Sequence, residues 1–115
     1  MDKKIEINLG AVEQVAVGQG RCFVINGHDV AVFRSRRGNL SAIENRCPHR
    51  GGPLADGIMG EDLVVCPLHG HKFNLKTGRG NDGHECVQTF FVCEREGNIV
   101  LEYPASLLRF SSRIG

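Results

Sequence analysis

Two short segments of the chain each contain one cysteine and one histidine, and they constrain the fold more than any other feature. The first segment is CPHRGG at residues 47–52, and the second is CPLHG at residues 66–70. Thiolates and imidazoles are side chains that bind zinc and iron–sulfur centres. Together the two segments suit either a tetrahedral zinc site or an iron–sulfur centre.

The composition supports metal binding by some of the cysteines. The chain has 115 residues, with five Cys, five His and 15 Gly. Five is an odd number, and reducing compartments disfavour structural disulfides, so metal ligation is the better explanation. Each segment mixes Cys with His, which favours iron–sulfur over zinc. Both segments are also rich in Gly, which lets a backbone amide approach an inorganic sulfide closely.

The other three cysteines, Cys22, Cys86 and Cys93, lie within apolar runs. A cysteine of this kind usually behaves as a small apolar residue. We expect these three side chains to fill the core.

Short apolar runs separated by turn residues predict an all-β barrel or sandwich. Alternating apolar residues at 5–9 are typical of an edge strand, and Asn26-Gly27 between two apolar runs is a strong hairpin signal. A last hairpin is expected from 87–92 and 98–102, across Glu96-Gly97. The other expected strands are 22–25, 30–33, 40–43 and 62–65.

The domain organisation expected from the sequence is simple. A chain of this length predicts one domain over residues 1–115, with its core at about 5–103. Two irregular stretches, 46–60 and 66–83, interrupt the strands and hold the Cys/His segments. Only the tail, 104–115, has helical character.

Charge and hydropathy argue against several classes of partner. The chain has 14 Lys and Arg against 13 Asp and Glu, a net charge of +1, which makes no electrostatic case for nucleic acid or a membrane surface. No apolar run approaches the roughly 18–20 residues of a membrane span. The charged start, MDKKIE, lacks the apolar region of a signal peptide. We therefore expect a cytoplasmic protein.

The two Cys/His segments, with their order and spacing, resemble the motif of the Rieske [2Fe–2S] family. The resemblance covers about residues 5–103. It implies that Cys47 and Cys66 bind one iron of a [2Fe–2S] cluster, and that His49 and His69 bind the other. It also implies a fold of three antiparallel sheets with a cluster-binding tip made of two loops.

Departures from the high-potential Rieske pattern predict a low reduction potential. High-potential members carry an extra Cys in each loop, joined as a disulfide, and the matching positions here are Gly52 and Leu68. Those members also place Ser and Tyr hydroxyls near the cluster sulfurs, where this chain has His71 and Phe73. Fewer hydrogen bonds to sulfur favour a potential of roughly −150 mV rather than +300 mV.

Residues 47–80 and the preceding IENR at 43–46 resemble the small subunit of assimilatory NAD(P)H nitrite reductase. In that family the large subunit carries flavin, a further iron–sulfur centre and siroheme, and reduces nitrite to ammonia. The resemblance implies electron transfer within, or to, such a subunit or another redox protein. Four protein ligands would saturate the two irons, so we expect no substrate site in this chain.

Two other functions remain open. One is a free Rieske ferredoxin that delivers electrons to an aromatic-ring dioxygenase. Such ferredoxins usually have a proline shortly before the final hairpin, and GHECV at 83–87 has none. The more distant alternative is a zinc-stabilised binding module with no redox role.

Several side chains near the two segments have expected supporting roles. We expect Leu54, Met59 and Leu68 to shield the cluster from water, and Phe73 to belong to the core. His71 lies two residues after a proposed ligand, so it either contacts the surroundings of the cluster or lies on the surface.

Overall fold

The computed structural model describes residues 3–47, 52–68, 70–81 and 85–107, in which it has ten strands and two short 3-10 helices. The strands are β1 (Lys4–Ala11), β2 (Gln19–Ile25), β3 (His28–Arg34), β4 (Leu40–Glu44), β5 (Ile58–Met59), β6 (Leu63–Val65), β7 (Lys72–Asn74), β8 (Thr89–Phe90), β9 (Val92–Arg95) and β10 (Asn98–Pro104), and the 3-10 helices are η1 (Val12–Gln14) and η2 (Leu54–Asp56).

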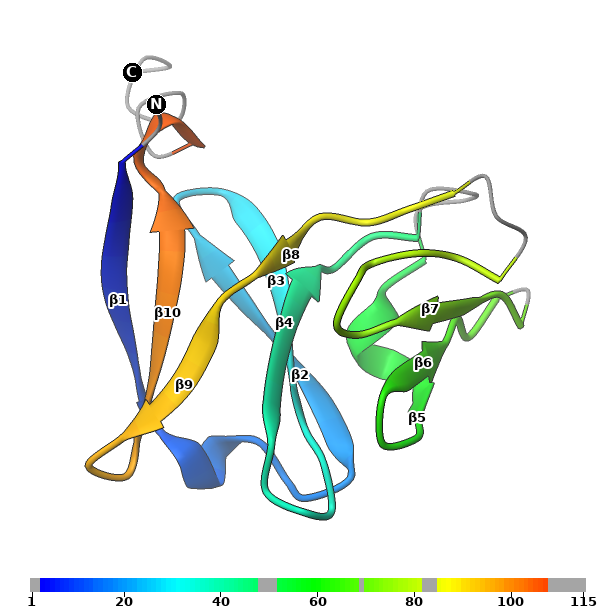
Figure 1. Ribbon diagram of the computed structural model, residues 1–115, viewed down its shortest axis with the longest axis horizontal. Coiled ribbons are helices and arrows are strands. Elements are labelled where there is room, and N and C mark those ends of the chain that lie inside the picture. Colours follow the sequence, from blue (N-terminus) through cyan, green and yellow to red (C-terminus); the bar gives the residue numbers. More distant parts are fainter. Residues whose placement is uncertain (1–2, 48–51, 69, 82–84, 108–115) are drawn as a thin grey trace.

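The strands form three antiparallel sheets, and Figure 1 shows how the sheets are arranged. Their strand orders are β1-β10-β9, β2-β3-β4-β8 and β5-β6-β7. The third sheet lies to one side of the other two, and the chain enters it after β4 and leaves it before β8. The all-β fold of three antiparallel sheets is therefore confirmed.

The hairpin expected at Asn26-Gly27 joins β2 to β3. Both turn residues have positive φ, 53° and 86°, and Ile25 pairs with His28 across the turn. Positive φ at both central positions defines the type I′ turn, and Asn-Gly adopts it more readily than other residue pairs. This local sequence therefore specifies the register of the whole hairpin.

The last hairpin turns at Glu96 and Gly97, with φ of 54° and 81°, but its first strand is β9 rather than 87–92. Residues 87–92 divide between two sheets, because β8 pairs with β4 and β9 pairs with β10. The chain changes sheet at Phe91, whose side chain is exposed. The sequence of residues 87–92 does not show where such a change falls.

Two strands, β5 and β7, lie in stretches that the sequence predicts to be irregular. β5 has two residues and β7 has three. Both pair with β6, with Ile58 opposite Val65 and Phe73 opposite Val64. Strands this short show no periodic pattern in the sequence. Their pairing with β6 defines them.

The expectation that Cys22, Cys86 and Cys93 fill the core is wrong. Cys22 and Cys86 are exposed, and Cys93 is half-buried. Cys22 lies on the edge strand β2. Cys86 directly precedes the buried Val87, and because successive side chains of an extended chain point to opposite sides, Cys86 points outward. None of the five cysteines, all of which lie in the described part of the chain, forms a disulfide.

The core consists of two clusters that meet at β3. Successive residues of a strand point to opposite faces. Ala31 and Phe33 therefore pack in one cluster, and Val30 and Val32 in the other. The first cluster reaches the third sheet, and the second fills the space between the two larger sheets.

Residues near the start of the tail are helical, as the sequence predicts. Residues 105–107 are helical, and Leu107 packs against the second core cluster. The remainder of the tail, 108–115, lies outside the described residues. Among the residues that are described, no helix is long and apolar enough to cross a membrane.

Candidate metal centre

The two cysteines of the motif are buried side chains of one core cluster. Cys47 follows the end of β4, and Cys66 comes directly after β6. Their exposed fractions are 0% and 2%, and both belong to the cluster that contains Phe33 and Phe73. Strands of two different sheets therefore deliver the two thiols to the same part of the core.

The two histidines of the motif, His49 and His69, lie outside the described residues. Within the described ranges, no three His, Cys, Asp or Glu side chains come together as a metal site. The assignment of Cys47, His49, Cys66 and His69 as ligands therefore stays a prediction from the sequence.

Each cysteine closes its own loop through its backbone N–H. The Cys47 N–H donates to the Gly52 carbonyl at 2.8 Å, and the Cys66 N–H donates to the His71 carbonyl at 2.7 Å. The second loop has a further hydrogen bond, from the Gly70 N–H to the Cys66 carbonyl at 3.1 Å. Gly70 has φ of +73°, a conformation that glycine adopts without strain. Each loop is therefore closed by a backbone hydrogen bond between its two described ends.

Gly52 brings the first loop against the second. A Cβ on Gly52 would lie 2.9 Å from Leu68 Cδ1 and 3.4 Å from Cys66 Sγ. The backbone of one loop thus reaches the thiol of the other with no side chain between them. This close approach fits a sulfide-bridged cluster, whose sulfurs accept hydrogen bonds from nearby backbone. The positions that the Rieske resemblance aligns with a disulfide are thus neighbours here, occupied by Gly and Leu.

Asn45 connects the first loop to the rest of the fold. Its side-chain Oδ1 accepts a hydrogen bond from the Ala55 N–H at 2.7 Å, in a buried setting. Its own backbone N–H donates to the Asp29 carbonyl at 3.0 Å. The sequence analysis missed this residue, although its place two positions before Cys47 was a signal.

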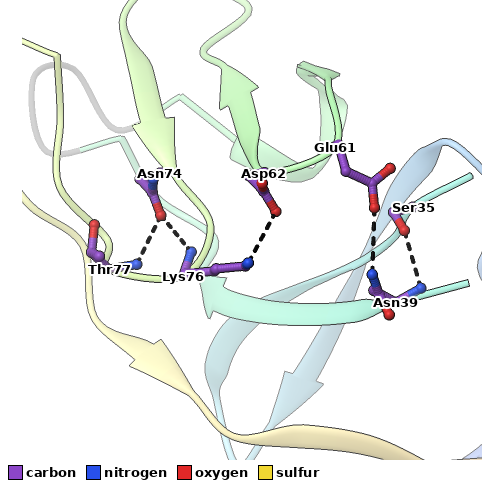
Figure 2. Close-up of polar contacts among 7 residues, drawn as sticks. All are labelled: Ser35, Asn39, Glu61, Asp62, Asn74, Lys76 and Thr77. Carbon is purple, nitrogen blue, oxygen red and sulfur yellow. Dashed lines mark hydrogen bonds and ion pairs between the residues drawn. The ribbon is translucent and has the colours of Figure 1, made fainter. Parts of the chain in front are cut away.

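We expect Asn45→Ala to lower the free energy of unfolding by about 2 kcal/mol, because the buried Ala55 N–H loses its acceptor. Urea denaturation measures the change. The matched control is Asn39→Ala, since the exposed Asn39 side chain contacts only Glu61 among the bonds drawn in Figure 2, at 3.4 Å. That control should cost no more than about 0.5 kcal/mol. Equal effects of the two variants would contradict the role given to Asn45.

A set of polar contacts in the third sheet fixes the turn after β7, as Figure 2 shows. Asn74 Oδ1 accepts hydrogen bonds from the backbone N–H groups of Lys76 and Thr77, at 2.8 and 3.0 Å. The Lys76 ammonium lies 3.6 Å from Asp62 Oδ1 in the turn between β5 and β6. The turns that close β5, β6 and β7 are thereby tied together.

The apolar residues around the cysteines differ in burial. Leu54 is fully buried in their cluster, and Met59 packs against it. Leu68 is 56% exposed, so it presents apolar surface on the second loop. Phe73 is fully buried, as expected for a core residue, and brings no hydroxyl to this region.

His71 contacts a carboxylate that the sequence analysis did not single out. Its Nδ1 lies 2.9 Å from Glu85 Oε1. A carboxylate only accepts hydrogen bonds, so Nδ1 carries the proton and donates it. That N–H is then committed to Glu85 rather than to a cluster sulfur. Nothing in the sequence pairs these two residues, because the contact depends on the fold between them.

Comparison with known protein families identifies the class of this protein. Residues 6–99 match the family model described as the Rieske [2Fe-2S] domain. The chain therefore belongs to the Rieske [2Fe–2S] family. It carries one Rieske-type [2Fe–2S] cluster and takes part in electron transfer.

Among curated proteins, the chain is similar to the 4beta-methylsterol monooxygenase of Methylococcus capsulatus. The two are 48% identical over 48 residues, which is 42% of this chain and 13% of the monooxygenase. Across the curated relatives compared, the chain spans between 8% and 22% of their length.

Two solved structures of similar size share the fold. The Escherichia coli protein NirD, a nitrite reductase small subunit, aligns with a TM-score of 0.79 at 21% identity, over 88% of this chain and 98% of NirD. The ferredoxin of carbazole 1,9a-dioxygenase from Nocardioides aromaticivorans aligns with a TM-score of 0.75 at 24% identity, over 84% of this chain and 95% of the ferredoxin. At these identities the likeness shows the fold alone.

Proposed function

We propose that Cys47 and Cys66 bind one iron of the cluster and that His49 and His69 bind the other. The support is the burial of both thiols in one core cluster and the close approach of Gly52 to Cys66 Sγ. When bound, the cluster supplies a one-electron redox couple. The role of the chain is to hold the ligands on two loops, each closed by a backbone hydrogen bond, and to exclude water with buried apolar side chains.

We further propose that the protein is the electron-transfer small subunit of an NAD(P)H-dependent nitrite reductase. The observation that carries this proposal is the loop sequence CPHRGGPLADG from residue 47, which resembles that family more than the ferredoxins. NirD, whose length the chain matches almost completely, has the same fold. With the irons fully ligated, the substrate site would belong to the partner, a large subunit with flavin and siroheme.

A reconstitution experiment tests this proposal. The cluster-loaded chain is added to the flavin and siroheme subunit from the same organism, and nitrite-dependent oxidation of NAD(P)H is measured. We expect the rate to rise with added chain, and the Cys66→Ser variant to give no increase. An unchanged rate would contradict the nitrite reductase assignment.

A second candidate is a free ferredoxin that serves an aromatic-ring dioxygenase. Its support is the fold and size shared with the carbazole 1,9a-dioxygenase ferredoxin, over 95% of that chain. Reduction of a dioxygenase by the reduced chain, together with failure in the nitrite reductase assay, would favour this candidate. A colourless protein with one zinc would contradict both.

We expect a midpoint potential near the low end of the Rieske range, roughly −150 mV. One residue of the second loop and one of β7 support this value, since the His71 Nδ1–H is committed to Glu85 and Phe73 has no hydroxyl. A redox titration followed by EPR measures it, and Phe73→Tyr should raise it if the new hydroxyl reaches a cluster sulfur. A midpoint well above about +100 mV would contradict the expectation.

A further inference from the structure

The contact between His71 and Glu85 joins the second loop to a separate part of the chain. The Nδ1 to Oε1 distance is 2.9 Å, and the two side chains are only 28% and 20% exposed. Ion pairs on an open surface contribute little because water and salt screen them. This pair is largely shielded from water, so its hydrogen bond contributes more to stability than that of an exposed pair.

On one side, the contact acts on the backbone of Cys66. The His71 carbonyl accepts the Cys66 N–H at 2.7 Å, so the two residues close the loop together. Between them, Gly70 has positive φ, and its added Cβ would meet nothing within 4 Å. Packing therefore does not hold the loop at Gly70. A restraint on the His71 side chain consequently restrains the position of Cys66.

On the other side, Glu85 begins a segment that backbone hydrogen bonds and bridges hold in place. Its carbonyl accepts the Gly80 N–H at 2.8 Å, and the next residue, Cys86, forms a bridge with Arg79. One residue further on, the Val87 N–H donates to the Gly78 carbonyl at 2.8 Å. These bonds run back to β7, because Gly80 also forms a bridge with Phe73. Glu85 is therefore a fixed support.

We propose that Glu85 is a positioning residue, which holds His71 and through it fixes the second loop so that the Cys66 sulfur stays in place for the cluster. This inference rests on the proposed role of Cys66 as a ligand. It assigns a function to a carboxylate outside both Cys/His segments. It also gives His71 a role in the loop that needs no direct contact with the cluster.

Retention of the cluster by Glu85 variants tests the proposal. In Glu85→Ala the His71 N–H loses its acceptor, so loss of visible absorbance in the presence of a chelator should be about tenfold faster, the effect of one charge-assisted hydrogen bond. Glu85→Gln keeps an oxygen that accepts from Nδ1–H, so it should restore most of the retention. A general defect in folding would not be rescued in this way.

A second variant and a second measurement make the test specific. His71→Ala should match Glu85→Ala, and the double variant should lose its cluster no faster than either single variant, since both remove the hydrogen bond that the two side chains share. Hydrogen exchange should rise in the peptide that contains Cys66 and His71. The matched control is Glu96→Ala, in the turn between β9 and β10 on a different sheet, which should behave as wild type (Figure 1).

Three results would overturn the proposal: wild-type retention in both single variants, additive effects in the double variant, or a Glu85→Gln protein as defective as Glu85→Ala. Failure of the proposed function looks different, because the Cys66→Ser protein would then retain its cluster. Hydrogen exchange in the metal-free protein also reports on the contact independently. Equal exchange in wild type and Glu85→Ala would show that the contact does not hold the loop.

Discussion

Purified Cys66→Ser protein is expected to be colourless and to lack the EPR signal of a reduced [2Fe–2S] cluster. Serine is close in size to cysteine, but its hydroxyl does not ionise near neutral pH and is a poor ligand for iron in this class of site. Cys66 is only 2% exposed, so water has little access to replace the lost ligand. Loss of the ligand should cost more than the roughly 10–100-fold in metal affinity that loss of a ligand's outer partner costs.

The chain offers a matched control for this variant. Cys86→Ser makes the same chemical change at an exposed cysteine outside the two Cys/His segments. It should keep wild-type iron content and absorbance. Retention of a normal cluster by Cys66→Ser would contradict the ligand assignment, and loss of the cluster in both variants would show that the effect is not specific to the site.

A single added methyl group at Gly57 is expected to destabilise the fold by about 3 kcal/mol, as overpacking in a closely packed region does. Gly57 follows η2, with φ of −76°, which alanine adopts without strain. Its added Cβ would, however, overlap the carbonyl oxygen of Val65 and lie 3.0 Å from Val64 Cγ2. The overlap is with backbone, so a change of rotamer does not relieve it.

The effect of Gly57→Ala should extend to the metal centre. Val65 is the last residue of β6 and directly precedes Cys66, so a displaced Val65 carbonyl moves the second loop. We expect a lower urea midpoint together with faster loss of the cluster. Gly60→Ala is the matched control, because its Cβ would make only an ordinary contact, 3.7 Å from Leu63 Cγ. Equal stability of the two variants would contradict this packing argument.

The sequence was a reliable guide where structure depends on neighbouring residues. Asn26-Gly27 specified a hairpin because positive φ at two successive residues is a local property. Glu96-Gly97 placed the last turn for the same reason. The apolar run at 30–33 predicted a strand, although only the fold showed that it is buried on both faces by two different clusters.

The expectations that failed depended on contacts between distant segments. The change of sheet at Phe91 follows from which strands, β4 or β10, lie nearest to each half of residues 87–92. Cysteine is a residue type often found in cores, but Cys22 is exposed on the edge strand β2 and Cys86 is exposed because its side chain points away from the buried side. An apolar residue type has a preference for burial, but whether it is buried depends on which segments pack against it in the fold.

The sequence by itself determined the class of protein, because the two Cys/His segments, with their order and spacing, are a property of the chain. Only the tertiary structure brought Cys47 and Cys66 into one buried cluster and set Gly52 beside the Cys66 sulfur. Only the tertiary structure paired His71 with Glu85. The physical reason is that ligand chemistry resides in single side chains, whereas their positions depend on hydrogen bonds and packing between segments far apart in the chain.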